Sequence, residues 1–185
     1  MSLPHALLTA LAERPSSGSD LAGRFDRSIG YFWHATHQQI YRELARMEEA
    51  GWIVSLPEES TRGRKRAYRL LPAGRKELKR WITLGDDAAP LRDELMVRLW
   101  ADAAVGPAGL AKDVRQRLKQ HQAMLARYQE IERRDFPLGP EDRATALRHL
   151  VLLAGIRYES YWIDLLREAL TTLDPSADIE RGQAS

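Results

Sequence analysis

The stretch YFWHATHQQIYRELARMEEAGW, residues 31–52, decides how the rest of the chain is interpreted. From Thr36 onward it predicts one helix, because Thr36 and Gln39 have the spacing of a capping box. One face of this helix is apolar and is formed by Ile40, Leu44 and Met47. We expect Gly51 to end the helix and Trp52 to begin a β-rich run.

The opposite face of this helix is polar. Amide side chains pair with adenine edges, guanidinium groups pair with guanine or phosphate, and the major groove of DNA admits a helix of this kind. The residues that we expect to contact DNA are Thr36, Gln38, Gln39, Tyr41 and Arg42. A surface helix with ordinary polar residues on its outer face is the alternative interpretation.

The segments around this helix predict a winged helix. Two short helices precede it, at residues 4–14 and 20–26, and two strands follow it, at residues 52–56 and 65–70. The loop between the strands is polar and ends in a basic run. Its cations are expected to lie on DNA phosphates, and they are Arg62, Arg64, Lys65 and Arg66. A solvated loop is the alternative for this run.

Charge is divided unevenly along the 185 residues. Residues 1–85 hold 14 Lys/Arg against 9 Asp/Glu, whereas residues 86–185 hold 14 against 17. This division predicts that only the first half meets a polyanion. The chain has no cysteine, which excludes disulfides and thiolate chemistry. It also has no export signal and no apolar run of the roughly 20 residues that span a bilayer, so we expect a soluble cytoplasmic protein without membrane contact.

The second half predicts helices that need a partner chain. A helix at residues 72–84, with Leu78, Trp81 and Ile82 inward, is expected to close the winged helix. Three helices follow, at about residues 91–104, 110–134 and 142–173, and the last is apolar on almost every side. A second copy of the chain is the economical cover. The expected dimer contacts are Leu118, Leu125, Leu147, Leu150, Tyr158 and Leu165.

These features define a mainly α fold with three parts. Residues 1–84 are expected to form the winged helix-turn-helix domain with a two-stranded wing, residues 85–175 a helical dimerisation domain, and residues 176–185 a loose tail. We find no nucleophile elbow, phosphate loop or dinucleotide fingerprint, so no enzyme activity and no cofactor are expected. His34 and His37 alone have ligand-like spacing, but no carboxylate lies near them in the sequence, and we predict no metal site.

Three runs of residues carry a family resemblance. They are Met1 to His5 with the leucines that follow, SIGYFW at residues 28–33, and HQQIYREL at residues 37–44. With the wing pattern RKR-x-Y-x-L and Gly74, they resemble the PadR family of bacterial transcriptional regulators. The similarity is strongest to the subgroup that holds the phenolic-acid-responsive repressors and a related virulence-gene activator. The HQQIYREL run is specific, and the match is strong over residues 1–84, whereas over residues 85–173 it lies in the number and layout of helices.

The resemblance implies a homodimer that binds an inverted-repeat DNA operator as a repressor. It also implies release of DNA by an aromatic acid held between two domains. The chain departs from the family pattern at Ser19, where an aromatic residue is usual, and at Leu71, where a threonine is common. Two alternatives remain: an effector-independent regulator controlled by its own abundance, and a winged helix used for contact with proteins.

We predict that a small aromatic acid effector binds beside residues at the start of the recognition helix. Trp33 offers a stacking face, and His34 and His37 can donate hydrogen bonds to a carboxylate. The unpaired amides at the start of a helix also favour a bound anion. The alternative is that Trp33 only fills the core at this turn.

Overall fold

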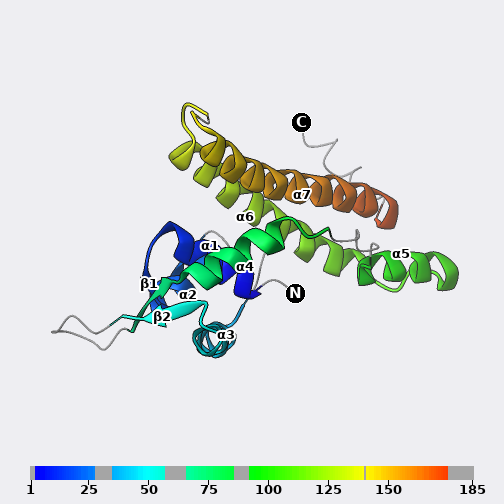
Figure 1. Ribbon diagram of the computed structural model, residues 1–185. Helices are drawn as coiled ribbons and strands as arrows, with labels where there is room; N and C mark the ends of the chain where they lie inside the picture. Colours follow the sequence, from blue (N-terminus) through cyan, green and yellow to red (C-terminus); the bar gives the residue numbers. More distant parts are fainter. Residues whose placement is uncertain (1–2, 28–34, 57–65, 86–91, 140, 175–185) are drawn as a thin grey trace. The chain divides into compact units, whose positions relative to one another are not determined.

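The structure is a computed structural model that describes residues 3–27, 35–56, 66–85, 92–139 and 141–174 (Figure 1). It consists of two compact units, residues 1–88 and residues 89–185, and each unit is described here by itself. No helix in the described ranges is both long enough and apolar enough to cross a membrane.

The N-terminal unit is a winged helix-turn-helix fold, as the sequence predicts. Along the chain its elements are α1 (Leu3–Glu13), β1 (Ser16–Ser17), α2 (Gly18–Arg27), α3 (His37–Glu49), β2 (Ile53–Ser55), β3 (Ala67–Leu70) and α4 (Pro72–Ile82) (Figure 1).

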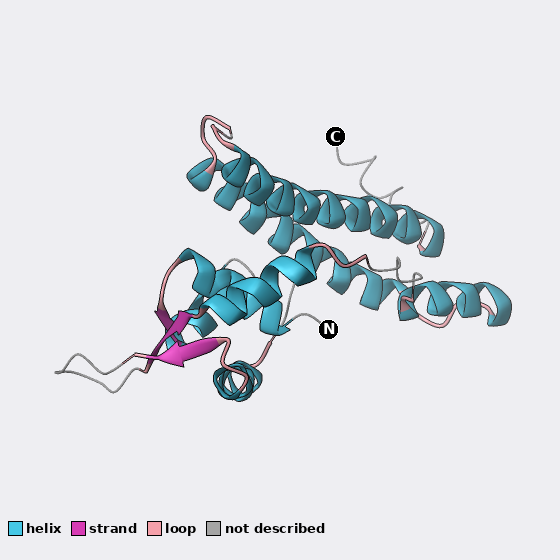
Figure 2. Ribbon diagram, in the orientation of Figure 1, coloured by secondary structure: helices cyan, strands magenta, loops and turns pink. Residues whose placement is uncertain are grey.

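The two predicted strands that flank the wing, β2 and β3, are present, and a third strand that the sequence does not predict joins them in one sheet. Its order is β1-β3-β2, and both pairings are antiparallel (Figure 2). The additional strand, β1, pairs Ser16 with Tyr68 and Ser17 with Ala67. The Ser17 hydroxyl also accepts a hydrogen bond from the backbone N–H of Asp20 at 3.1 Å, so this strand caps the helix that follows it.

One hydrophobic core holds the N-terminal unit together. It consists of apolar side chains from all four helices and from β2 and β3: Leu7, Leu8, Ala10, Leu11, Leu21, Ala22, Ile40, Leu44, Met47, Ile53, Tyr68 and Leu78. In α4, Leu78 is buried as expected, but Trp81 and Ile82 are exposed within this unit, which corrects the prediction that they point inward. The Trp81 ring instead stacks on His5 of α1, with the ring centroids 4.5 Å apart.

The C-terminal unit consists of three helices. They are α5 (Glu94–Val105), α6 (Ala111–Asp135) and α7 (Arg143–Leu173), and their core is formed by Leu95, Val114, Trp162 and Leu166. Helices α6 and α7 lie side by side as an antiparallel hairpin (Figure 1). Two histidine–glutamate contacts cross this hairpin, His121 Nδ1 to Glu159 Oε2 at 2.5 Å and His149 Nε2 to Glu132 Oε1 at 2.9 Å.

Candidate nucleic-acid interface

Helix α3 is held in the N-terminal unit by its apolar face and by its first turn. Ile40, Leu44 and Met47 are fully buried in the core. At the first turn, the Gln39 N–H donates to Thr36 Oγ1 at 3.2 Å, and the Thr36 N–H donates to Gln39 Oε1 at 2.8 Å. This reciprocal capping box satisfies amides that would otherwise have no partner at the helix start.

The two adjacent glutamines, Gln38 and Gln39, differ in what their side chains contact. Gln39 Oε1 also accepts a hydrogen bond from the Thr36 hydroxyl at 3.2 Å, so both side chains are engaged in the cap. Gln38 and Arg42 are exposed, and the side chain of neither forms a hydrogen bond or ion pair with another described residue. Among the residues predicted to contact DNA, these two therefore present the least encumbered polar groups.

Tyr41 lies against the start of α2. A Cβ atom added to Gly18 would meet Tyr41 Cε1 at 2.4 Å, so the ring packs directly over the first residue of α2. The Tyr41 side chain is nevertheless 48% exposed. One side of the ring is therefore in contact with the protein, while the other remains available to a ligand.

The base of the wing is joined to the C-terminal end of α3. Arg66 lies within 3.4 Å of Glu48 Oε2 and donates a hydrogen bond to Ser55 Oγ at 2.9 Å. Its guanidinium carbon also lies 6.0 Å from the centroid of the Tyr68 ring. The other three wing cations of the sequence analysis, Arg62, Arg64 and Lys65, lie outside the described residues.

Polar contacts also tie α4 to α1. Glu77 Oε1 lies 3.2 Å from His5 Nε2, and Arg80 donates two hydrogen bonds to the same carboxylate at 2.7 and 2.8 Å. The hydrogen bonds from Arg80, followed by that from His5, lower the pKa of Glu77 from 4.5 to about 2. At its start, α4 has no side-chain cap at Leu71, as expected where leucine replaces a hydroxyl residue.

The proposed effector residues are only partly within the described chain. Trp33 and His34 lie outside it, and His37 is the first residue of α3, with its side chain exposed. Among the described residues, no three His, Asp or Glu side chains come together as a metal site.

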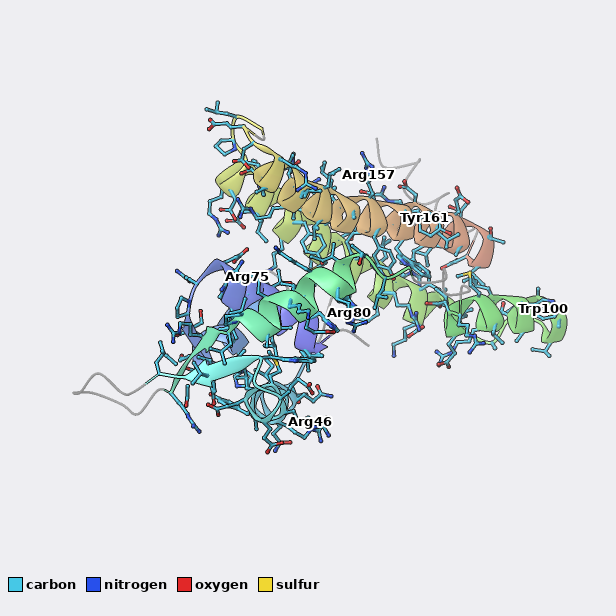
Figure 3. The ribbon with its side chains drawn as sticks, in the orientation of Figure 1. Arg46, Arg75, Arg80, Trp100, Arg157 and Tyr161 are labelled. Atoms are coloured by element: carbon cyan, nitrogen blue, oxygen red, sulfur yellow. The ribbon has the colours of Figure 1, made fainter. Side chains whose placement is uncertain are left out.

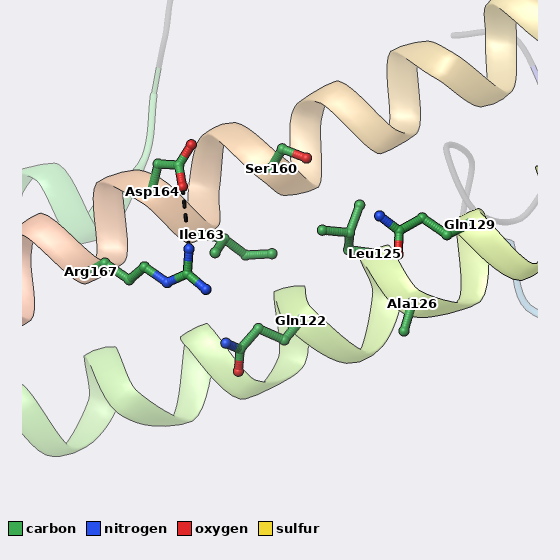
Figure 4. Close-up of a pocket in the computed structure, with 8 residues that line it drawn as sticks. All are labelled: Gln122, Leu125, Ala126, Gln129, Ser160, Ile163, Asp164 and Arg167. Atoms are coloured by element: carbon green, nitrogen blue, oxygen red, sulfur yellow. Dashed lines mark ion pairs between the residues drawn. The ribbon is translucent and has the colours of Figure 1, made fainter. Parts of the chain in front are cut away.

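The residues predicted to form a dimer occupy three kinds of position in the C-terminal unit. On α7, Leu147, Leu150 and Tyr158 are exposed, Leu150 to 55%. Leu118 of α6 and Leu165 of α7 instead pack against the core cluster of their own chain. Leu125 lines a shallow groove between α6 and α7, where Arg167 and Asp164 form an ion pair at 3.5 Å (Figure 4).

Two residues at the interface, Gly18 and Glu48, are not predicted from the sequence. Neither has a local motif, because each acts through a contact with another element: Gly18 through Tyr41 of α3, and Glu48 through Ser55 of β2 and Arg66.

The fold and the exposed face of α3 define a winged-helix DNA-binding transcriptional regulator. Family models agree: residues 7–80 match the "Transcriptional regulator PadR-like family", and residues 91–174 match the "Virulence activator alpha C-term" family. The chain is 40% identical to the "probable transcriptional regulator Rv1176c" of Mycobacterium tuberculosis, with 92% of this chain and 98% of that protein covered. The chain belongs to the PadR-like family of transcriptional regulators.

Two solved structures cover almost the whole chain. The virulence activator AphA of Vibrio cholerae is 32% identical with a TM-score of 0.78, covering 94% of this chain and 99% of that chain. PadR of Bacillus subtilis in complex with operator DNA is 24% identical with a TM-score of 0.79, covering 94% and 100%. The same PadR has also been solved in complex with p-coumaric acid, at 23% identity and a TM-score of 0.76, covering 94% and 99%.

Proposed function

We propose that the protein is a repressor that binds an inverted-repeat operator as a homodimer, through α3 and the wing. The observation that carries this proposal is the exposed face of α3. Gln38 and Arg42 lie on a helix that is fixed by a capping box at its start and by three buried side chains along its back. A rigid helix with free amide and guanidinium groups suits readout of bases in the major groove.

Dimerisation is supported by the apolar surface of the C-terminal unit. Along α7, exposed apolar or aromatic side chains recur at Leu147, Leu150, Val151, Tyr158 and Tyr161. Tyr161 and, on α5, Trp100 project from the surface of this unit (Figure 3). Exposed apolar stripes of this kind mark protein–protein contacts, and a second copy of the chain satisfies the symmetry of an inverted repeat.

We also propose that a small aromatic acid controls DNA binding, at a site near Trp33, His34 and His37. The support is the p-coumaric acid complex of PadR together with the stacking and hydrogen-bonding groups of these residues. Control by abundance without an effector is the second candidate. A winged helix that only contacts proteins is disfavoured by the four cations of the wing, Arg62, Arg64, Lys65 and Arg66.

The proposal of sequence readout is tested with DNA that the full-length protein selects from a random pool. Gln38→Ala is expected to cost about 1–3 kcal/mol on the selected duplex and almost nothing on a mixed-sequence duplex. Replacing both Arg64 and Lys65 with alanine is expected to weaken both duplexes equally. It should also flatten the slope of log K against log salt by about 0.9 per lost phosphate contact. Equal loss on both duplexes for Gln38→Ala would overturn its role in base readout.

The dimer and the effector need separate measurements. Leu150→Arg is expected to convert the dimer to a monomer in sedimentation and to abolish binding to the selected duplex, because two linked recognition helices are needed.

Hydroxycinnamic and hydroxybenzoic acids are then titrated while operator release and tryptophan fluorescence are followed together. No release at millimolar acid would replace effector control by control through abundance.

A further inference from the structure

Glu48 occupies a junction between the recognition helix and the wing. It lies one residue before the end of α3, and its Oε1 accepts a hydrogen bond from the backbone N–H of Ser55 at 2.8 Å. Ser55 is the last residue of β2, just before the wing, and Arg66 is the residue that precedes β3, just after it. The carboxylate of Glu48 therefore contacts the chain on both sides of the wing.

The three residues form a closed polar network. Arg66 lies within 3.4 Å of Glu48 Oε2, and the Arg66 guanidinium also donates to Ser55 Oγ at 2.9 Å. Hydrogen bonds from the hydroxyl and the backbone N–H of Ser55, helped by the charge of Arg66, hold the pKa of Glu48 below its ordinary value. The Glu48 side chain is 27% exposed and that of Arg66 is 60% exposed, so the network lies at the surface of the unit and is held by its several contacts together.

We infer that Glu48 is a positioning residue that fixes the base of the wing to the recognition helix, and that Arg66 serves this brace rather than a DNA phosphate. The inference rests on the proposed function, in that α3 and the wing are taken as the two DNA-contacting elements. It revises one assignment of the sequence analysis, because Arg66 was grouped there with the phosphate-contacting cations.

If Glu48 positions the wing, removing its charge should change the affinity for DNA in the direction opposite to that expected from electrostatic repulsion alone. A carboxylate near a polyanion repels it, so removing the charge should strengthen DNA binding if nothing else changes. If Glu48 positions the wing, its loss should weaken DNA binding, because the wing cations must then be ordered at the expense of binding free energy. The sign of the change therefore separates the two accounts.

The closing experiment compares Glu48→Gln with Glu49→Gln in the full-length protein. Glutamine at position 48 keeps an oxygen for the Ser55 N–H but loses the ion pair with Arg66. Glu49 lies next to it in the same helical turn, is exposed, and forms no ion pair with another described residue, so Glu49→Gln removes the same charge without touching the brace. Affinity is measured for a 40-base-pair duplex selected from a random pool and for a mixed-sequence duplex of equal length.

We expect Glu48→Gln to bind both duplexes about threefold to tenfold more weakly, and Glu49→Gln to bind them equally well or more tightly. Arg66→Gln, which breaks the same pair from the other side, should lose as much affinity as Glu48→Gln without flattening the salt slope. The double variant should lose no more than either single variant, because both remove one brace.

Three results would overturn the inference. They are unchanged or tighter binding by Glu48→Gln, additive losses in the double variant, and a salt slope flattened by about 0.9 in Arg66→Gln, which would make Arg66 a phosphate contact. Circular dichroism and thermal unfolding check that each variant is folded, and Arg66→Gln carries the test if Glu48→Gln is not. The proposed function fails separately, if the wild-type protein selects no duplex and its retention on DNA does not depend on salt.

Discussion

Gly18→Ala is expected to change DNA binding through Tyr41 and to leave the fold nearly intact. The new Cβ would lie 2.4 Å from Tyr41 Cε1 and 3.1 Å from its Cδ1 and Cζ atoms. Non-bonded carbons approach to roughly 3.5–4.0 Å, so the ring has to retreat by about 1 Å. The Tyr41 ring is the group that must move, and it lies on the exposed surface of the recognition helix. The substitution therefore changes that surface directly.

The expected change in stability for Gly18→Ala is the sum of two opposing contributions to the free energy of unfolding. Overpacking in a closed site costs about 1–3 kcal/mol, but the Tyr41 ring is half-exposed and can swing outward, so the cost should fall at the lower end. Alanine in place of glycine in a helix contributes about 0.4–1 kcal/mol in the other direction. We therefore expect the free energy of unfolding to change by less than about 1 kcal/mol. The affinity for DNA should fall by roughly fivefold through loss of one well-placed contact.

The assay is fluorescence anisotropy on the selected duplex, with thermal unfolding followed in parallel. Tyr41→Ala provides the matched background, because it removes the atoms with which the new Cβ overlaps. In that background Gly18→Ala should cost no further affinity and should raise the melting temperature. Equal losses of affinity in the wild-type and Tyr41→Ala backgrounds would refute the argument, as would an unchanged affinity in the wild-type background.

Two further predictions concern the stability of the N-terminal unit. Gly74→Ala would place a Cβ 2.3 Å from the backbone oxygen of Trp52, which accepts the Leu71 N–H and cannot yield freely, so we expect a loss of about 1–3 kcal/mol in thermal unfolding. Gly85→Ala, with nothing within 4 Å, is the control, and an equal loss there would contradict the steric reason. For Glu77→Gln, the stability lost relative to wild type should be full above about pH 4.5 and vanish as the pH falls toward about 2. The folded pKa of Glu77 lies below its ordinary value, so its stabilising contribution disappears on protonation. Melting temperatures of both proteins between pH 2 and pH 6 measure this, and a difference independent of pH would contradict it.

The recognition helix was predictable from sequence because its determinants are local. Ile40, Leu44 and Met47 have helical spacing and are buried together, and the Thr36–Gln39 cap forms with both of its hydrogen bonds. Both features depend on residues within a few positions of one another, where side-chain geometry follows directly from the helical repeat.

The features that sequence reasoning missed depend on contacts between distant segments. The two serines of β1 have neither alternation nor β-branched residues, and they become a strand only because β3 lies alongside them. Trp81 has the periodicity of an inward residue, yet its ring stacks on His5 at the surface of the unit. The contacts of Glu48 with Ser55 and Arg66 likewise depend on the pairing of β2 with β3, which brings together residues that are far apart in the sequence.

The contacts of α3 also limit how an effector could act. The helix is fixed at its start by the capping box, at Tyr41 by the start of α2, and at Glu48 by the base of the wing. Tilting α3 within its unit would break several of these contacts at once, whereas moving the unit as a body would break none of them. In the proposed dimer, two recognition helices must reach half-sites about 34 Å apart. An aromatic acid is therefore expected to release DNA by changing the separation of two intact N-terminal units. It should abolish binding to the full inverted repeat while leaving the weak affinity for a single half-site unchanged.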